Sequence, residues 1–143
     1  MILLDTNAWI RWLHPELGQS MPLALRNWLN ESPLPIAISV ISCLEVSQLV
    51  KKGDLLLPLP LPDWFHEALE VSGVSYLPLT PAIAHASTLL PNIHKDPADR
   101  LIIATAQAYD AWLVTRDQTI PQYPDVRVVW DNAPRPNGDG EPA

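Results

Sequence analysis

The chain has 143 residues, of which 48% are hydrophobic and 17% charged, and this suits one globular domain with a buried core. Its formal net charge is −7, whereas a protein that binds nucleic acid simply by coating the phosphates is normally basic. The composition therefore excludes global disorder, argues against simple phosphate coating, and leaves a basic partner, bound cations or plain solubility as explanations of the negative charge.

Three features bear on the cellular compartment. The first residues, MILLDTN, contain neither a basic stretch nor a long apolar segment, so no secretory signal is predicted. Prolines interrupt the charge-poor run Leu55–Pro62, and no segment approaches the roughly 20 apolar residues of a membrane span. The single cysteine, Cys43, cannot form an internal disulfide and is interpreted as a small buried apolar residue. We expect a cytoplasmic protein without a membrane segment.

The chain opens with a strand followed by a helix. Ile2–Leu4 is a short apolar run that predicts a strand, and the next three residues can each cap a helix. Trp9, Trp12 and Leu13 then fall at helical spacing, and Pro15 ends the helix.

The rest of the chain continues this alternation of apolar strands and helices. Strands are expected over Pro35–Ile41, Ser75–Leu79, Ala111–Thr115 and Val126–Trp130. Helices are expected over Pro22–Asn30, from Ser42 to Lys52 with Gly53 closing the helix, over Asp63–Val71, from Thr80-Pro81 to Leu90, and over Asp96–Asp110. The alternating prolines of Leu55–Pro62 indicate an extended connection.

This alternation predicts an α/β fold with a mainly parallel sheet over residues 1–130. The tail 131–143, rich in Pro, Gly, Asn and Asp, is predicted to be disordered. Ligands of parallel α/β sheets bind off the carboxyl ends of the strands. Acidic residues at those strand ends are therefore the first candidates for a functional site.

Two such acids follow predicted strands directly. Asp5 can cap the first helix, although Thr6 and Asn7 could cap it equally well. Asp117 follows the apolar run that ends at Thr115 and can serve as a turn residue or helix cap. Taken singly, each aspartate is explained by local structure.

A third acid, Glu45, also has a structural explanation. It stands three residues after Ser42, and Ser-x-x-Glu is a capping box. Against this, Glu45 shares a helical face with Val46 and Leu49, which would turn it inward. Both interpretations stay open at this point.

The stretch HKDPADRLIIATA contains two aspartates at one helix start. Pro97 after Asp96 is typical of a cap followed by proline at the first helical position. Asp99 falls instead on the apolar face, because it lies three, four and seven residues before Ile102, Ile103 and Ala106. An unpaired carboxylate on a buried face is costly, so Asp99 needs a function other than capping.

Asp5, Glu45, Asp99 and Asp117 are expected to meet at one edge of the sheet. Four carboxylates gathered there repel one another unless hard divalent cations lie between them, and magnesium or manganese accepts such oxygen ligands. Two such ions about 4 Å apart can support phosphodiester cleavage. The sequence thus indicates a metal-dependent phosphodiesterase site.

At this point the sequence resembles the PIN-domain ribonucleases, and more narrowly the VapC-type toxins of type II toxin–antitoxin pairs. The resemblance extends to about Trp130. It depends on LLDTN at Leu3–Asn7, SVISCLEVSQL at Ser39–Leu49, HKDPADRLIIATA at His94–Ala106 and LVTRD at Leu113–Asp117. Each fragment is short, and their order and spacing carry the resemblance.

The resemblance implies a three-layer α/β/α domain and an endoribonuclease that uses one or two Mg²⁺ or Mn²⁺ ions. Asp5 and Asp99 would be the firmest ligands, and Glu45 and Asp117 would complete the site. Thr115 would support Asp117 by hydrogen bonding. Asn7 would do the same near Asp5, and Asp96 keeps its role as a cap.

The resemblance also implies partners: an RNA substrate, a cognate antitoxin protein and a second copy of the chain in a homodimer. Trp9, Trp12 and Trp28 are candidates for a groove that receives the antitoxin, with core packing as the alternative.

Basic residues near the acids are candidate phosphate contacts. Lys95, Arg100 and Arg116 flank the site acids in the sequence, with ion pairing or solvation as the alternative. His94 is a candidate for proton transfer, with a surface-loop histidine as the alternative.

Two other functions compete with an RNA-cleaving toxin. A different magnesium-dependent phosphoryl hydrolase is one, although a dehalogenase-like phosphatase would have an aspartate at the position of Asn7, and no P-loop pattern is present. A catalytically silent PIN-like binding module is the other, but a silent site has no reason to keep four mutually repelling acids.

Overall fold

The computed structural model describes residues 1–17 and 21–134. Five short strands form one sheet in the order β3-β2-β1-β4-β5. They are β1 (Ile2–Leu4), β2 (Ile36–Ser39), β3 (Ser75–Leu77), β4 (Trp112–Val114) and β5 (Arg127–Val129). Every neighbouring pair is parallel, which confirms the α/β fold and the parallel sheet expected from the sequence.

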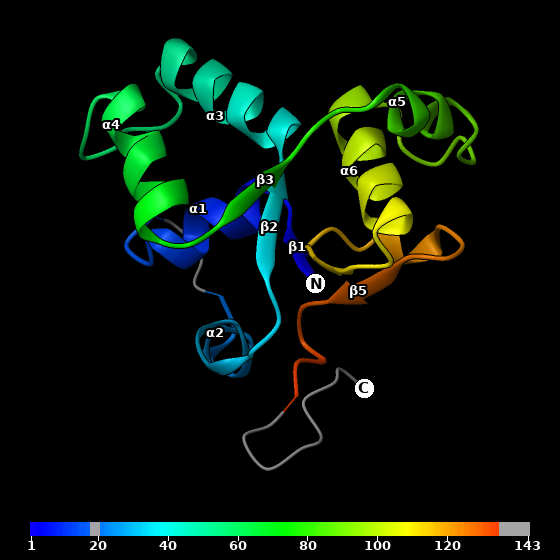
Figure 1. Ribbon diagram of the computed structural model, residues 1–143, viewed down its shortest axis with the longest axis horizontal. Coiled ribbons are helices and arrows are strands. Elements are labelled where there is room, and N and C mark those ends of the chain that lie inside the picture. The colour runs from blue at the N-terminus through cyan, green and yellow to red at the C-terminus, as the bar shows by residue number, and fades with distance from the viewer. Residues whose placement is uncertain (18–20, 135–143) are drawn as a thin grey trace.

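Helices cover both faces of the sheet (Figure 1). One face carries α1 (Thr6–Leu13), α2 (Leu23–Glu31), α3 (Val40–Lys52) and α4 (Leu61–Phe65), which continues into the π-helical turn η1 (His66–Val71). The other carries α5 (Pro81–Thr88), α6 (Pro97–Ala108) and the short 3₁₀ turn η2 (Ile120–Gln122). The result is a three-layer α/β/α domain.

The first strand shows why the centre of the sheet is apolar. Ile2 and Leu4 point into the core beneath α1–α4, and Leu3 points into the core beneath α5 and α6. All three are fully buried, because a central parallel strand has helices on both sides and no face in water.

Helix α3 begins earlier than the sequence predicted. The predicted strand ran to Ile41, but β2 ends at Ser39, whose hydroxyl accepts the Ile41 amide and caps the helix. Ser42 lies within the first turn and is fully buried. The capping-box interpretation of Glu45 is therefore wrong, since the residue that caps this helix is not Ser42.

Other boundaries differ by less. The helix expected over Asp63–Val71 is α4 followed by the π-helical turn η1, and η2 was not predicted. In the predicted tail, Asn132 accepts a hydrogen bond from the Trp130 amide and donates one to Val128. Residues 135–143 of that tail lie outside the described part of the chain.

The tryptophans expected in an antitoxin groove belong largely to the core. Trp9 and Trp28 are buried beneath the first helices, and the Trp12 indole donates to Asn30. Core packing is thus the correct interpretation of Trp9 and Trp28. An apolar groove of about 330 Å³ lies beside α1. It is lined by Leu13 and by Trp64, which is not one of the three predicted tryptophans.

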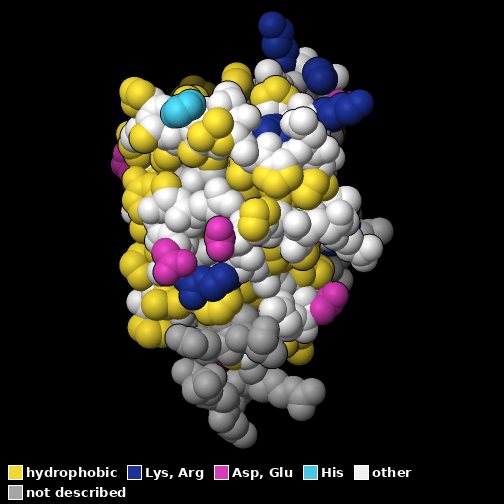
Figure 2. Space-filling model, turned by 90° about the vertical axis from the view of Figure 1, so that its right-hand side faces the viewer, with side chains coloured by type: hydrophobic (Ala, Val, Ile, Leu, Met, Phe, Trp, Pro, Cys, Tyr) yellow, Lys and Arg dark blue, Asp and Glu magenta, His cyan; other side chains and the backbone are white. Residues whose placement is uncertain are grey.

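On the side where α5 and α6 lie, the described residues form no continuous basic stripe. Figure 2 shows hydrophobic side chains scattered over that face, with Lys and Arg side chains gathered mainly at its upper edge. Within residues 1–17 and 21–134 we find no helical segment with the length and hydrophobicity that a membrane span requires.

Candidate functional site

The predicted site acids lie where the parallel strands end. Asp5 follows β1, Asp117 comes shortly after β4, and Glu45 and Asp99 are carried by α3 and α6. Each of these carboxylates except Asp117 has its pKa raised partly by the negative charge of other acids of this edge. The four acids therefore form one electrostatic unit, which we call the acid cluster.

Asp5 both caps a helix and belongs to the acid cluster. Its Oδ1 accepts the Ala8 amide at 2.8 Å, so the predicted cap of α1 is confirmed. Burial is the largest influence on this carboxyl and raises its pKa to about 6, helped by the charges of Glu45 and Asp117 and opposed by hydrogen bonds from Thr115 and Ala8. A carboxyl in this state binds a proton or a cation more readily than one in water does.

Glu45 is held by hydroxyl groups. Thr6 Oγ1 donates to Glu45 Oε1 at 2.5 Å and lies 2.8 Å from the Ser42 hydroxyl. Burial raises the pKa of Glu45, the Thr6 hydrogen bond lowers it, and the charge of Asp96 raises it again. The inward orientation predicted from the helical face is thus correct, and Thr6 fixes this side chain across 39 residues of sequence.

The two aspartates at the start of α6 have different surroundings. Asp96 accepts the Ala98 amide at 2.8 Å and caps the helix. Asp99 lies above Ile102 and Ile103, which are buried. Burial raises the pKa of Asp99 to about 6, and the charge of Asp96 raises it further, while His94 lowers it. Asp96 therefore also influences the acid cluster electrostatically.

Asp117 is the best-partnered member of the acid cluster. Its Oδ1 accepts both the amide and the hydroxyl of Thr119, at 2.8 and 2.7 Å, and its Oδ2 lies 2.9 Å from His94 Nε2. Burial acts to raise the pKa of Asp117, but the Thr119 hydrogen bonds and the His94 charge outweigh it, so the pKa is lowered. Thr115 supports this residue as predicted, because its hydroxyl accepts the Asp117 amide at 3.1 Å.

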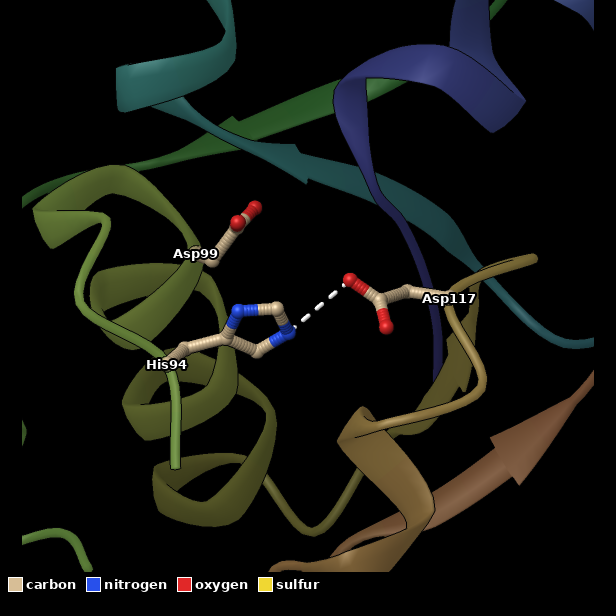
Figure 3. A group of neighbouring side chains, drawn as sticks. All are labelled: His94, Asp99 and Asp117. Carbon is tan, nitrogen blue, oxygen red and sulfur yellow. Dashed lines mark ion pairs between the residues drawn. The ribbon is translucent and has the colours of Figure 1, made fainter. Parts of the chain in front are cut away.

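His94 joins the acid cluster from the connection before α6. Figure 3 shows Asp99 and Asp117 projecting into the same space from different elements, with the His94 ring beside both. One ligand atom from each of these three side chains can be chosen so that all lie within 4.8 Å of one another. The His94 backbone amide donates to the Tyr123 hydroxyl at 2.6 Å, and the rings of His94 and Tyr123 are stacked. His94 is thus a partly buried site residue and not a surface-loop histidine.

The donor set at this edge suits a hard divalent cation. Carboxylate oxygens are the ligands that Mg²⁺ and Mn²⁺ prefer, and oxygens of Asp99 and Asp117 can lie with a His94 ring nitrogen within 4.8 Å of one another. Burial raises the pKa values of Asp5 and Asp99 to about 6, and a bound cation favours the ionised form of such groups. The chemistry of the residues therefore fits a metal centre.

Asn7, predicted as a supporting residue, and Arg100, a candidate phosphate contact, are placed differently from these predictions. Asn7 is exposed and accepts from Arg11, so it does not face Asp5; its neighbour Thr6 is the residue turned inward. The Arg100 guanidinium donates to four backbone carbonyl oxygens of the segment before α6, those of Ser87, Leu90, Pro91 and His94. Arg100 thus fastens the connection that carries His94, because its donors are directed at carbonyl groups and not at a phosphate site.

The other two basic candidates are on the surface. Lys95 and Arg116 are both exposed and adjoin His94 and Asp117 in the sequence. Their contact with RNA stays a prediction.

The sequence predicted the role of the Thr115 hydroxyl but not those of three other hydroxyl groups at this site. Thr6, Ser42 and Thr119 are all in hydrogen-bonded contact with a site acid or with its partner. A signal was present for two of them: Ser42 lies three residues before Glu45 on the same helical face, and Thr119 lies two residues after Asp117, the spacing of an Asx turn.

Residues 2–126 match the sequence profile of the PIN domain. The chain is a PIN-domain protein. Ribonuclease VapC22 from Mycobacterium tuberculosis is 33% identical to it over 132 residues, which are 90% of this chain and 98% of that protein. This PIN domain therefore belongs with the VapC proteins, as the sequence fragments indicated.

Solved structures agree with this assignment. A toxin–antitoxin complex from Klebsiella pneumoniae contains a chain that is 25% identical, with a TM-score of 0.61 and coverage of 90% of this PIN domain and 96% of that chain. The VapBC2 complex of Rickettsia felis, bound to a promoter DNA fragment, gives a TM-score of 0.67 at 21% identity, with 92% and 100% coverage. The second likeness supports the fold alone.

Proposed function

We propose that this protein is a metal-dependent endoribonuclease and acts as the VapC-type toxin of a toxin–antitoxin pair. The observation that carries the proposal is the acid cluster at the carboxyl edge of the sheet, where ligand atoms of Asp99, Asp117 and His94 can all lie within 4.8 Å of one another. Burial raises the pKa values of Asp5 and Asp99 in this cluster to about 6. The similarity to a named ribonuclease over nearly the whole chain supports RNA as the substrate.

In this proposal Asp5, Glu45, Asp99 and Asp117 hold one or two Mg²⁺ or Mn²⁺ ions. When bound, such an ion stabilises negative charge on a phosphodiester and favours attack by water. The chain's own residues orient these ligands: Thr6 fixes Glu45, and Thr119 and His94 fix Asp117. Ligands fixed in this way need little rearrangement to bind a cation.

Cleavage of RNA with and without metal tests the enzymatic part. Purified protein with Mg²⁺ or Mn²⁺ is expected to cut RNA at internal positions, and excess EDTA is expected to stop it. The reaction is followed by gel electrophoresis of end-labelled RNA. Cleavage that continues undiminished in EDTA would overturn the metal-dependent mechanism.

Growth on expression tests the toxin part. Structural neighbours of this chain are toxin–antitoxin complexes, so we propose an antitoxin protein as its partner. Expression alone is expected to arrest growth, and co-expression of a small protein encoded next to it is expected to restore growth. Unimpaired growth with a protein that is active in vitro would contradict the toxin role. The homodimer stays a prediction, and light scattering of the purified protein measures it.

A further inference from the structure

A pocket of about 590 Å³ adjoins the acid cluster at the β5 edge of the sheet. Thr115 and Asp117, which belong to the candidate metal centre, also line this pocket. The chain just after β5, Trp130–Asn132, lines it as well. The volume of the pocket lies in the range of small-ligand sites. Because the pocket shares Thr115 and Asp117 with the candidate metal centre, a substrate bound at the acid cluster can extend into it.

The lining combines apolar surface with an aromatic ring and an amide. Pro121, Val126 and Val128 supply the apolar part, and Trp130 supplies an indole that is only partly buried. Gln118 is exposed and offers both a donor and an acceptor. Flat heteroaromatic groups bind such surfaces, because aromatic side chains stack on nucleobases and amides pair with their edges.

The carboxylates of the pocket bear on which base it prefers. Asp117 is paired with His94 and belongs to the acid cluster. Asp131 also lines the pocket and is exposed, so its carboxylate can accept a hydrogen bond from a ligand. Carboxylates accept hydrogen bonds from exocyclic amino groups, so Asp131 favours a base that has one.

We propose that this pocket binds one unpaired nucleobase of the RNA, on a nucleotide next to the phosphodiester held at the acid cluster, and prefers a base with an exocyclic amino group over uracil. The inference rests on the proposed ribonuclease function and adds the part of the substrate that the protein reads. Trp130 stacks on the base, and Gln118 and Asp131 contact its edge.

The test begins with the cleavage site of the wild-type protein, mapped on an end-labelled RNA. Oligonucleotides spanning that site are then made with an abasic residue, or with uracil, at each nucleotide beside the cut. Their Kd values are measured by fluorescence anisotropy with Asp99→Asn protein, and with the same protein carrying Trp130→Ala, Trp130→Phe or Gln118→Ala. Gln48→Ala, an exposed glutamine on α3 outside the pocket, is the matched control.

Trp130→Ala is expected to raise the Kd about tenfold, the effect of losing one base–aromatic stack, while Trp130→Phe restores most of the affinity. An oligonucleotide that is abasic at the position read by the pocket is expected to bind the Asp99→Asn protein about tenfold more weakly than the intact RNA does. With the protein that also carries Trp130→Ala, the same abasic residue is expected to have little further effect, because the stacking partner is already absent. Uracil there is expected to bind more weakly than cytosine or adenine. Gln118→Ala, whose side chain is exposed, tests the pocket without disturbing the core, and a severalfold increase in Kd against none for Gln48→Ala is expected.

The outcomes separate this inference from the function on which it rests. Absence of any metal-dependent cleavage overturns the proposed function, and the inference with it. Metal-dependent cleavage together with unchanged Kd values for both Trp130→Ala and Gln118→Ala overturns the inference and leaves the ribonuclease function standing.

Discussion

Asp99 and Asp117 lie in one site but are held in opposite ways. Asp99 has its pKa raised to about 6 by burial and by the charge of Asp96, whereas Thr119 and His94 lower the pKa of Asp117. Asp99 and Asp117 can contact a common ligand, but hydrogen bonds from Thr119 and the charge of His94 outweigh burial only at Asp117. The protein therefore stabilises the ionised form of Asp117, whereas burial disfavours the ionised forms of Asp99 and Asp5.

The largest expected effect comes from removing the charge of Asp99. Asp99→Asn is expected to lower RNA cleavage about a thousandfold or more, because several kcal/mol of charge stabilisation depend on a correctly bound ion. The metal-free protein is expected to stay folded. Cleavage rates and circular dichroism measure the two effects.

Asp96→Asn is the matched control for that change. Asparagine caps a helix about as well as aspartate, so its cost in stability is expected to be about 1 kcal/mol or less, with cleavage largely retained. If Asp96→Asn were as inactive as Asp99→Asn, the division of roles between the two aspartates would be wrong.

A second, intermediate effect concerns stability and pH. The pKa of Asp5 is raised from 3.8 to about 6, so the folded protein binds this proton more tightly than the unfolded chain does. Stability in EDTA is therefore expected to fall as the pH rises from about 4 to 6, with the full cost present above pH 6. Asp5→Asn keeps a cap and is expected to raise the free energy of unfolding by about 1–3 kcal/mol at pH 7.5, with little change at pH 4.

Asp117→Asn is expected to change the free energy of unfolding in the opposite direction from Asp5→Asn. The pKa of Asp117 is lowered, so its ionised form stabilises the folded protein above the ordinary pKa of 3.8, and this contribution is lost as the pH falls through the lowered pKa. Asp117→Asn is expected to destabilise the metal-free protein at pH 7.5. Urea unfolding of both variants measures this, and equal signs for Asp5→Asn and Asp117→Asn would refute the contrast.

The smallest expected effect concerns the hydroxyl that holds Glu45. Thr6→Val removes the hydrogen bond to Glu45 and leaves the fully buried Ser42 hydroxyl without its Thr6 contact. A loss of about 1–2 kcal/mol in stability is expected, with cleavage reduced about tenfold. Asn7→Ala, one residue away but exposed, is expected to change neither by more than about 0.5 kcal/mol or twofold. Equal effects of the two changes would show that the Thr6 contact does not support the site.

Local patterns in the sequence were sufficient where one element decides the outcome. The Asp96-Pro97 start of α6 and the inward face shared by Asp99 and Ile102 follow from helix geometry, and both predictions are confirmed. The same patterns were insufficient for α3, because Ser39 and Ser42 are equally good caps in isolation and the end of β2 selects Ser39. The sequence leaves Arg100 open between a phosphate contact and ion pairing or solvation for a similar reason: its carbonyl partners come from the segment before the helix, whose path the sequence does not define.

The sequence by itself determined the alternation of strands and helices, the parallel sheet and the expectation that four acids meet at its edge. These depend on periodicity and on the rule that parallel strands end on one side. Only the tertiary structure decided which neighbours those acids have. Thr6, Thr119 and His94 come from elements separated along the chain. A carboxylate's pKa depends on burial and on charges within a few ångströms, which no local pattern specifies.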